Sequence, residues 1–359
     1  MIPLLENLSP EEKEALEEES LPERVSPMLA VLADESFSDP GWIFERKLDG
    51  ERTLCLSDGE GVRLMSRNGR DLSKSYPELV EALQEMPLST GAREEASTDE
   101  DSPSRVSWVG DGEVVAFDGD ITSFSRLQAR MQISDPDEAR KSSVAVYYYL
   151  FDLLHLADRD LTSLPARTRK ALLRNLFDFA DPIRFTTHRN EDGEAFHEEA
   201  CRSGWEGIIG KKGDSPYVKS RSRSWLKFKC VARQELVIGG FTDPGGTRSG
   251  FGALLVGYYS EEGKLRYAGK VGTGFDEETL QRLAGLFRRA QRKTPPFARE
   301  DRDDFPGDGV HWITPKFVGD FGFSEWTTSG KLRHPRFLGI RRDKDPEEVR
   351  RETPEPSPS

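Results

Sequence analysis

The sequence has only three cysteines and no long apolar run, and both features limit what the protein can be. No stretch of about 18 apolar residues occurs in the 359 residues, and the N-terminus lacks the basic and then apolar start of a secretory signal. We therefore expect a cytoplasmic protein with no membrane partner. Cys55, Cys201 and Cys230 are far apart and form no C-x-x-C pair, which argues against a disulfide framework and against a structural zinc site. We expect them to be buried small hydrophobic residues.

Acidic side chains outnumber basic ones, and an acidic total ordinarily argues against a nucleic-acid partner. The 51 Lys and Arg minus the 64 Asp and Glu give a net charge of −13. Much of this charge lies in residues 1–40, where 11 acidic and 2 basic side chains give −9. Two segments are basic instead: residues 201–236 hold 9 basic and 3 acidic side chains, and residues 331–344 hold 6 and 1. The distribution of charge therefore leaves a polyanionic partner open.

The first part of the chain predicts an α+β domain over residues 25–231. Short β-branched and aromatic runs, separated by Asp-Gly or Asn-Gly, predict antiparallel hairpins from residue 42 onward. Residues 1–24 have too few apolar positions to bury a face, so we expect an acidic leader that is disordered or a solvated helix. A Ser-, Glu- and Asp-rich surface insertion is expected at about 89–107. Helices are expected at 76–86, 124–131 and 165–179.

The second part of the chain differs from the first in composition and in its predicted elements. Residues 232–345 contain glycine-rich short strands and one predicted helix at 276–292, a pattern that suits a small OB-fold β-barrel. Residues 346–359 are rich in proline and serine, and we expect them to be a disordered tail. The chain length agrees with two soluble domains.

One short segment combines a lysine, a turn signal and an arginine. Lys47 ends an apolar strand pattern, Asp49-Gly50 follows, and Arg52 lies five positions after the lysine. A charged hairpin end with an Asp-Gly turn would look the same. This segment alone does not separate a structural role from a catalytic one.

Four later segments place charged or aromatic residues beside strand patterns. Each segment alone also fits a strand-edge carboxylate, a core aromatic residue, a glycine turn or a solvated basic strand. Taken together, and in this order, they favour a common site. The four segments are Asp111-Gly112-Glu113-Val114-Val115, Phe151-Asp152, Glu206-Gly207-Ile208-Ile209-Gly210-Lys211 and Trp225-Leu226-Lys227-Phe228-Lys229.

This series of motifs resembles the covalent nucleotidyltransferase superfamily, which contains ATP-dependent DNA ligases, RNA ligases and mRNA capping enzymes. The resemblance implies a nucleotidyltransferase (ATP-grasp-like ligase) domain with antiparallel sheets, followed by an OB-fold domain. It also implies that Lys47 is the lysine that becomes nucleotidylated. An amine attacks phosphorus only when it is deprotonated, and neighbouring cations and partial burial favour that state. Lys227 and Lys229 lie two apart on one strand, and so on one face, where they can provide such cations and bind the triphosphate.

The resemblance implies further roles for residues around Lys47. Glu113 and Glu206 are expected to hold Mg²⁺ or Mn²⁺, a hard cation whose charge offsets the charge that builds up on the phosphoryl oxygens. Phe151 is expected to stack on the adenine of ATP. The expected nucleotide-binding set also contains Glu45, Arg52 and Arg67, and both arginines are candidates for binding the ribose or the 5′-phosphate of a nick.

A longer resemblance, over about residues 26–345, points to one branch of the superfamily. Residues 124–130 look like the S-F-x-x-L-Q-x-R segment of DNA ligases, and residues 237–257 and 267–275 are similar to the OB domain of bacterial end-joining ligases of the LigD type. Arg341-Arg342-Asp343-Lys344 matches their closing R-x-D-K motif. The match implies that Arg341 and Lys344 orient the pyrophosphate leaving group, although a basic patch that only binds DNA would look the same.

We therefore expect an ATP-dependent DNA ligase that seals 5′-phosphate/3′-hydroxyl nicks or breaks in duplex DNA through a lysine-AMP intermediate, in repair by non-homologous end joining. The expected cofactors are ATP and Mg²⁺ or Mn²⁺. The expected partners are nicked or broken duplex DNA, a Ku-like end-binding protein and a separate repair polymerase, with the ligase itself a monomer that associates with the nucleoid when it acts. The alternatives are an RNA ligase, a capping-type guanylyltransferase, and a non-catalytic protein that bridges DNA ends.

Overall fold

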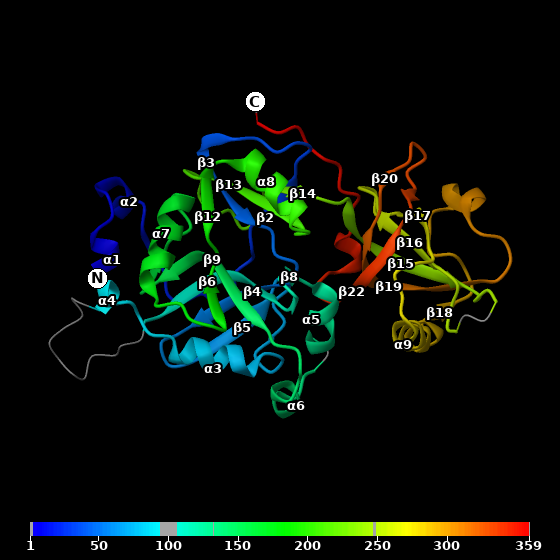
Figure 1. Cartoon of the computed structure of the whole chain (residues 1–359), viewed down its shortest axis with the longest axis horizontal. Helices are drawn as coiled ribbons and strands as arrows, with labels where there is room; N and C mark the ends of the chain where they lie inside the picture. The colour runs from blue at the N-terminus through cyan, green and yellow to red at the C-terminus, as the bar shows by residue number, and fades with distance from the viewer. Residues whose placement is uncertain (1–2, 94–105, 132, 247–248, 359) are drawn as a thin grey trace. The chain divides into compact units, whose positions relative to one another are not determined.

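The structure is a computed structural model that describes residues 3–93, 106–131, 133–246 and 249–358 (Figure 1). The chain divides into two compact units, one formed by residues 1–230 with 354–359 and the other by residues 231–353. No helix in the described part of the chain is long and apolar enough to cross a membrane.

Two β-sheets form the first unit. The larger sheet has the strand order β1-β10-β9-β6-β4-β5, and β11 pairs in parallel with β9. Its strands are β1 (Glu17–Glu18), β4 (Glu51–Ser57), β5 (Val62–Ser66), β6 (Trp108–Val115), β9 (Tyr147–Leu156), β10 (Arg159–Asp160) and β11 (Ile183–Phe185). The smaller sheet has the order β12-β3-β13-β14-β2, in which β14 and β2 are parallel. Its strands are β2 (Leu29–Leu32), β3 (Asp39–Arg46), β12 (His188–Glu191), β13 (Gly207–Lys212) and β14 (Arg221–Lys229).

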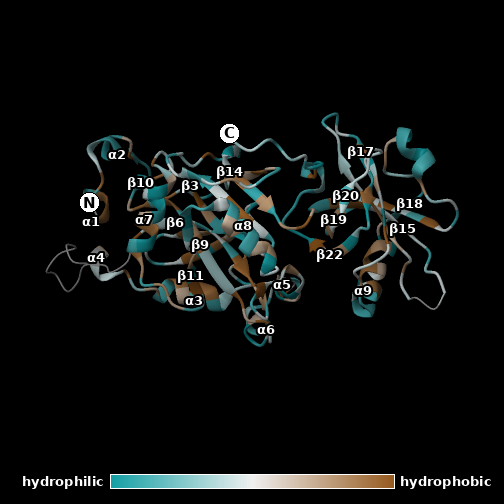
Figure 2. Ribbon diagram, turned by 45° about the horizontal axis from the view of Figure 1, so that its top comes forward, coloured by the Kyte–Doolittle hydropathy of each residue, from teal (hydrophilic) through white to brown (hydrophobic). Residues whose placement is uncertain are grey.

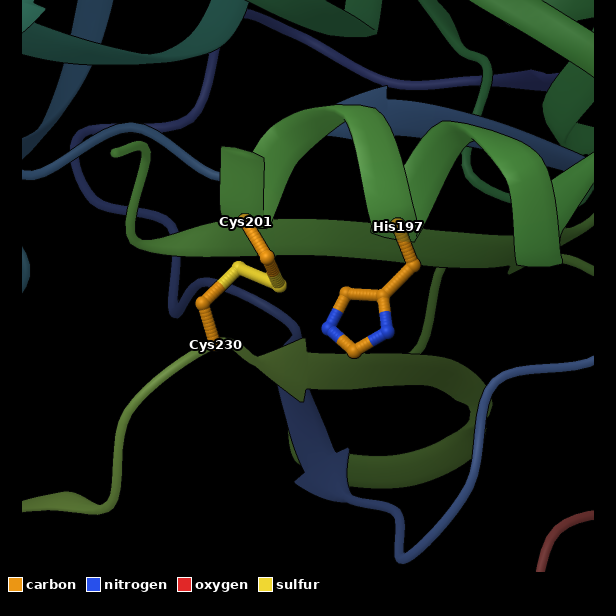
Figure 3. Close-up of side chains that lie close together, drawn as sticks. All are labelled: His197, Cys201 and Cys230. Carbon is orange, nitrogen blue, oxygen red and sulfur yellow. A yellow bond between two sulfur atoms is a disulfide. The ribbon is translucent and has the colours of Figure 1, made fainter. Parts of the chain in front are cut away.

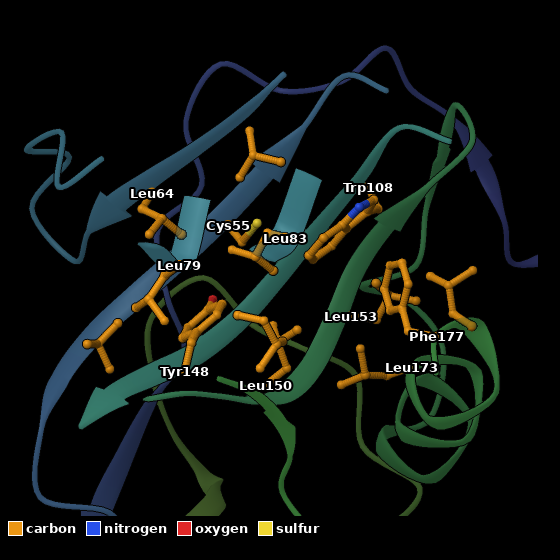
Figure 4. Close-up of a cluster of buried hydrophobic side chains, with 14 of the residues drawn as sticks. Cys55, Leu64, Leu79, Leu83, Trp108, Tyr148, Leu150, Leu153, Leu173 and Phe177 are labelled. Atoms are coloured by element: carbon orange, nitrogen blue, oxygen red, sulfur yellow. The ribbon is translucent and has the colours of Figure 1, made fainter. Parts of the chain in front are cut away.

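A large hydrophobic core lies against the larger sheet. Leu79 and Leu83 from α3 and Leu173 from α7 pack there against buried strand residues such as Tyr148 and Leu150 (Figure 4). The predicted helices at 76–86, 124–131 and 165–179 are confirmed. The one at 124–131 has the predicted bounds, and the other two are shorter than predicted. The helices and short strand pair of this part are α3 (Pro77–Glu85), α4 (Thr90–Arg93), α5 (Phe124–Met131), α6 (Pro136–Arg140), α7 (Ala166–Leu176), α8 (Gly193–Arg202), β7 (Phe117–Asp118) and β8 (Ile121–Thr122).

The leader at residues 1–24 is part of the first unit, so the prediction of disorder was wrong, whereas residues 10–14 form a helix with no buried residue, as the alternative of a solvated helix predicted. Two short helices form, α1 (Pro3–Glu6) and α2 (Pro10–Glu14), and β1 pairs with β10. Leu5 is 1% exposed and belongs to the large core. Leu5 in the core, three partly buried leucines packed against that core (Leu4, Leu8 and Leu16) and the β1–β10 pairing hold the segment. These few contacts produce no periodic pattern in the sequence.

The prediction of a disordered tail at 346–359 was also wrong for the residues that the structure describes. Gln234 binds residues 350–352, donating to the carbonyl of Arg350 at 2.8 Å and accepting from the N–H of Glu352 at 3.0 Å. Residues 354–359 return to the first unit, where the N–H of Glu355 donates to the carbonyl of Leu32 at 2.9 Å. The tail thus adds main-chain pairing to the edge of the sheet at β2. A short helical turn, η2 (Pro346–Glu348), starts this segment.

The passage from β3 to β4 differs from the predicted hairpin. β3 pairs with β12 and β13, whereas β4 belongs to the larger sheet and pairs with β5 and β6. Asp49-Gly50 therefore carries the chain from one sheet to the other. A Cβ atom at Gly50 would lie 2.1 Å from the carbonyl oxygen of Val114, so only glycine fits at this position. The Asp-Gly pair signals a close backbone approach here.

Two of the three cysteines form a disulfide, which the sequence argued against. Cys201 at the end of α8 is bonded to Cys230, with Cα atoms 5.1 Å apart, while Cys55 is buried and unbonded as expected. The two cysteines are 29 positions apart, and the chain between them contains the antiparallel strands β13 and β14, which return it to α8. Of the acidic insertion predicted at 89–107, residues 94–105 lie outside the described residues; in α4, Ala92 is buried in the core.

The second unit has the strand order β17-β16-β15-β19-β18, with β22 paired to β19. Within the described residues the ladder stays open between β17 and β18, and one bridge joins Thr273, after β17, to Arg336. Its elements are β15 (Arg233–Thr242), β16 (Leu254–Tyr259), β17 (Leu265–Val271), α9 (Glu277–Arg288), β18 (Gln291–Arg292), η1 (Arg299–Asp304), β19 (Val310–Gly322), β20 (Glu325–Trp326), β21 (Leu332–Arg333) and β22 (Arg336–Arg341).

The helix of the second unit, α9, has the amphipathic pattern that packing on a sheet requires. Hydrophobic and hydrophilic stretches alternate along it (Figure 2). Leu283 and Phe287 are fully buried, and the Asp276 side chain caps the helix by accepting from the N–H of Thr279 at 2.8 Å. The helix ends at Arg288, four residues before the predicted end, because residues 291–292 pair with β19. Short strands and one long helix agree with the predicted OB-type unit.

The buried position of Leu5 generates a test of the leader. Leu5→Ala should lower the free energy of unfolding of the full chain by about 2–4 kcal/mol, because it removes a core side chain and leaves a cavity. Urea unfolding followed by tryptophan fluorescence measures this change. Glu14→Ala, an exposed residue of α2, is the matched control and should change stability by less than about 0.5 kcal/mol. Equal effects of the two substitutions would contradict the packed leader.

Candidate active site

Lys47 lies where the chain leaves the smaller sheet, in a pocket built from both sheets of the first unit. Its N–H donates to the carbonyl of Gly207 at 2.9 Å, which extends the β3–β13 pairing by one residue. The next residues cross to β4. The pocket is lined by Ala30, Glu45, Arg46, Lys47, Leu48, Arg52, Glu113, Phe151, Ile209, Lys211 and Trp225.

The Lys47 amine is held by a carboxylate. Its Nζ lies 2.7 Å from Oε2 of Glu206, which directly precedes β13. The Lys47 side chain is 20% exposed and the Glu206 side chain 11%. The amine is therefore fixed in position and still open to a ligand in the pocket.

Glu45 is the centre of a buried ion cluster below the pocket. Its Oε1 lies 2.6 Å from the ammonium of Lys170 on α7, and its Oε2 lies 2.9 Å from that of Lys211 on β13. All three side chains are buried. Burial lowers the pKa of Lys170 to about 8; Glu45 opposes this shift and the charge of Lys211 adds to it. The predicted role of Glu45 in nucleotide binding is thus accompanied by a clear structural role.

Phe151 presents its ring to the pocket with two cations beside it. The guanidinium carbon of Arg52 lies 4.6 Å from the ring centroid and Nζ of Lys211 lies 4.5 Å from it. Trp225 packs edge-on against the same ring, with centroids 6.1 Å apart. The carbonyl of Phe151 also accepts from Lys211 at 3.4 Å. An aromatic ring held this firmly is a suitable surface for a planar base.

Arg52 is fixed by Asp111, a residue to which the sequence assigned no role. Nε and one Nη of Arg52 each lie 2.6 Å from an Asp111 carboxylate oxygen, and the hydroxyl of Tyr217 donates to Asp111 at 2.6 Å. Burial opposes the charge of Arg52, but the Asp111 carboxylate raises its pKa well above the usual range. The planar guanidinium is therefore always charged and oriented against Phe151. Glu113 stands opposite Arg52 in the β4–β6 register and lines the same pocket.

The two lysines of β14 lie on the face of the sheet that lines the pocket. Lys227 is opposite Ile209 and Lys229 is opposite Gly207 in the antiparallel β13–β14 pair. Residues directly opposite each other point to the same face, and Ile209 lines the pocket. Trp225, two residues before Lys227, also lines it. The alternation argument made from the sequence therefore places both lysines on the correct face.

Six predicted site residues lie outside the pocket lining. Glu206, Lys227 and Lys229 are described above, and the other three are Arg67, Arg341 and Lys344. Arg67 follows β5 in the turn closed by the N–H of Gly69 and the carbonyl of Ser66. Arg341 and Lys344 belong to the second unit. There Arg341 forms a two-point pair with Asp343 at 2.9 and 2.6 Å, and Lys344 lies 3.5 Å from Glu235. The roles of Arg67, Arg341 and Lys344 in binding ATP or DNA stay predictions.

Sequence reasoning missed Lys170, Lys211 and Asp111. Lys211 could have been found, because it lies two residues after Ile209 on a strand whose alternate residues share one face. Asp111 could have been found in the same way, two residues before Glu113 on β6. Lys170 gives no such signal, since it is one of several basic residues in a helix and only the packing of α7 brings it to Glu45.

Both units match families of known proteins. Residues 27–229 match the ATP dependent DNA ligase domain, and residues 247–344 match the ATP dependent DNA ligase C terminal region. The multifunctional non-homologous end joining protein LigD of Pseudomonas aeruginosa is 35% identical over 339 residues, which cover 93% of this chain and 37% of that protein. The DNA ligase 2 of Haloquadratum walsbyi is 32% identical, over 89% of this chain and 50% of that protein. The chain thus spans at most about half the length of these relatives.

A solved structure agrees with the fold. The mycobacterial DNA ligase D complexed with ATP and MES is 32% identical, covers 92% of this chain and 99% of its own length, and has a TM-score of 0.62. It supports a nucleotidyltransferase ligase fold followed by an OB-type domain, as the sequence indicated. With a family match over more than half of its residues, the chain belongs to the ATP-dependent DNA ligases, and its relatives place it with the LigD type.

Proposed function

We propose that this chain seals 5′-phosphate/3′-hydroxyl breaks in duplex DNA with ATP, forming AMP and pyrophosphate, and that Lys47 carries the AMP. The observation that carries the proposal is the Lys47 amine, held 2.7 Å from Glu206 in a pocket that also contains Phe151 and Lys211. This arrangement supplies a nucleophile, a carboxylate that fixes it, an aromatic surface and a buried cation.

The first step follows from the position of the amine. Lys47 Nζ, once deprotonated, attacks the α-phosphorus of ATP, the bond from phosphorus to the pyrophosphate oxygen breaks, and a lysine-AMP phosphoramidate forms. The Glu206 carboxylate, within hydrogen-bond distance of Nζ, is placed to receive or pass on the departing proton. Little other acid-base chemistry is needed, because phosphoryl transfer depends mainly on positioning and charge stabilisation.

The remaining pocket residues orient ATP. Phe151 would stack on the adenine, with Arg52 and Lys211 holding the ring. Lys227 and Lys229 would bind phosphate oxygens from their shared face of β14. Glu45 keeps Lys211 in place, and Arg67 remains a candidate for contacts at the edge of the site.

The residues present fit a hard divalent cation. Glu113 and Glu206 offer carboxylate oxygens, the ligands that Mg²⁺ and Mn²⁺ prefer, and Glu113 lines the pocket. When bound, such an ion would offset the negative charge that develops on the phosphoryl oxygens. We propose that these two residues hold it.

The later steps need DNA. AMP would pass from Lys47 to the 5′-phosphate of the break, and the 3′-hydroxyl would then displace AMP and join the strand. Contacts with DNA should go mainly to its backbone, so sealing should be insensitive to sequence and weakened by salt. Arg341 and Lys344 would orient the leaving pyrophosphate during the first step. In the second unit, Arg341 is paired with Asp343 and Lys344 with Glu235.

The LigD relatives support a role in end joining, and we propose that role for this chain. The expected partners are a Ku-like end-binding protein and a separate repair polymerase, and the expected metal is Mg²⁺ or Mn²⁺. We also propose that the ligase acts as a monomer in the cytoplasm. The relatives named DNA ligase support DNA ends over the RNA-ligase, capping and end-bridging alternatives.

The nucleophile is tested by Lys47→Ala. Sealing of a 5′-phosphorylated nick with ATP and Mg²⁺ or Mn²⁺ should fall by at least about 10³-fold, because the first covalent step loses its nucleophile. Covalent labelling of the protein by ATP carrying a labelled α-phosphate should disappear. Gel assays of nicked DNA and of the labelled protein measure both effects. Parallel assays with GTP in place of ATP, and with nicked RNA in place of nicked DNA, test the capping-type guanylyltransferase and RNA ligase alternatives.

Two controls separate loss of chemistry from loss of folding. Lys219→Ala removes an exposed lysine of the same unit and should leave both assays unchanged. A nick that already carries 5′-AMP bypasses the first two steps, so Lys47→Ala should still seal it to a measurable extent. Unchanged labelling of Lys47→Ala by ATP would contradict the assignment of Lys47 as the nucleophile. Wild-type protein that becomes labelled by ATP but seals no DNA would contradict the proposed ligase activity.

The buried Lys170 predicts a pH dependence of stability. Its pKa is lowered from 10.5 to about 8, so between these values the unfolded chain binds a proton that the folded chain does not, and the free energy of unfolding rises with pH. From about pH 7 to about pH 9.5, wild-type protein should gain about 2 kcal/mol relative to Lys170→Met.

Urea unfolding at the two pH values measures this difference. Lys219→Met, which changes an exposed lysine, is the matched control and should follow the wild type. A Lys170→Met variant whose stability changes with pH as the wild type's does would contradict the assignment of the shift to Lys170.

A further inference from the structure

We propose that the reduced chain binds a soft divalent metal ion of the Zn²⁺ type through His197, Cys201 and Cys230. The site lies in the first unit and is distinct from the ligase pocket. In the oxidised chain a disulfide joins the two cysteines. The cysteines can therefore either form the disulfide or bind the metal ion, but not both at once. The inference does not rest on the proposed ligase function.

Helix geometry brings two of the ligands together. His197 and Cys201 are four residues apart on α8 and therefore lie on one face of the helix, one turn apart. Cys230 directly follows β14, which returns the chain to this face. Figure 3 shows the imidazole ring beside the disulfide, with one ring nitrogen on the side of the sulfur atoms.

The three ligand atoms are close enough to share one ion. One nitrogen of His197 and the two sulfur atoms all lie within 4.8 Å of one another. Zinc is bound by thiolate sulfur at about 2.3 Å and by imidazole nitrogen at about 2.0 Å, so its ligand atoms stand roughly 3.5–4 Å apart in a tetrahedral site. Breaking the disulfide lets the sulfurs separate to this spacing. Within the described residues, this is the one group of at least three His, Cys, Asp or Glu gathered so tightly.

The surroundings of the His197 ring favour its binding to a metal ion. Its Nδ1 lies 3.2 Å from the hydroxyl of Ser36, which fixes the ring, and its Nε2 is buried with no hydrogen-bond partner among the described residues. A buried polar nitrogen without a partner is costly, and a metal ion would satisfy it.

Two thiolates and an imidazole select a soft or borderline ion over Mg²⁺. Cys201 is exposed, so solvent can fill the fourth position of a tetrahedral site. The metal proposed for the ligase pocket would be held by carboxylates, so the two sites differ in ligand type. Magnesium should therefore not compete at the cysteine site.

Replacement of the disulfide by a metal ion requires a reductant. A dithiol reductant transfers two electrons and two protons to the disulfide, which gives the Cys201 and Cys230 thiols, while the reductant becomes a disulfide. Binding of the divalent ion then displaces the two thiol protons, because only thiolates ligate. An oxidant that accepts two electrons reverses the change and releases the ion.

The site also lies next to residues of the ligase pocket. The N–H of Cys230 donates to the carbonyl of Glu206 at 3.0 Å, and Cys230 follows Lys229 in the chain. The disulfide and the metal ion would therefore each link the end of α8 to the strand that carries Lys227 and Lys229.

Metal titration of the full chain tests the proposal. Protein reduced with a dithiol and freed of reductant without air should take up one Zn²⁺ per chain in competition with a chromophoric chelator, and air-oxidised protein should take up none. Co²⁺ in place of Zn²⁺ should give the thiolate-to-metal charge-transfer absorption and the visible bands of a tetrahedral site. A thousandfold excess of Mg²⁺ should not reduce Zn²⁺ uptake.

Variants assign the ligands. Cys201→Ser and Cys230→Ser should lose the Co²⁺ charge-transfer band and stoichiometric Zn²⁺ uptake, and His197→Gln should weaken Zn²⁺ binding by at least about tenfold. Cys55→Ala and His311→Gln are the matched controls and should bind like the wild type. The thermal unfolding midpoint of each variant shows whether it is folded, and Zn²⁺ should raise that midpoint only where the site is intact.

Two results would overturn the proposal. One is a reduced wild-type chain, with three thiols by titration, that takes up no stoichiometric Zn²⁺. The other is binding that persists at the same affinity in folded Cys230→Ser and His197→Gln, which would place the ion elsewhere.

Discussion

The crossing of the chain from one sheet to the other after Lys47 is the constraint on which the site depends. The backbone of Lys47 is still paired with Gly207, so the lysine is the last residue fixed by the smaller sheet. Gly50 then passes so close to the carbonyl of Val114 that no side chain fits. Because of this passage, residues of both sheets surround the Lys47 amine, and Glu206 at the start of β13 can hold it. A hairpin at this point would have left the lysine on one sheet, without the residues of the other.

Charge balance explains why the pocket suits an anion. Buried ions are stable in proteins only when they are paired, and Glu45 is paired with both Lys170 and Lys211. One carboxylate facing two ammonium groups leaves a net charge of +1 when both are protonated. Arg52 is neutralised by Asp111, which leaves the excess positive charge at the Glu45 cluster. A phosphate group entering the pocket would meet this charge in surroundings where water screens it poorly.

The sequence was informative where chemistry follows from strand alternation and motif order. Glu45, Phe151 and Lys227 could be placed because alternate residues of a strand share a face and because the motif series matches a known superfamily. What depends on contacts between distant segments could not be predicted. The burial of Leu5, the pairing of Glu355 with the edge of β2, and the Cys201–Cys230 bond each rest on tertiary contacts between distant segments. Such contacts leave no periodic signal, and composition suggested the opposite in all three.

The disulfide joins the ends of a segment that carries much of the site. Between Cys201 and Cys230 lie Glu206, Lys211 and the two lysines of β14. Closing a loop of 29 residues removes conformational entropy from the unfolded chain, about 3–4 kcal/mol in the chain-entropy description. The same link ties the end of α8 to the end of β14, and the pairing of β13 with β3 brings Glu206 to Lys47. The disulfide therefore stabilises the segment that carries Glu206 and Lys211, while strand pairing within the smaller sheet sets the position of Glu206 at the nucleophile.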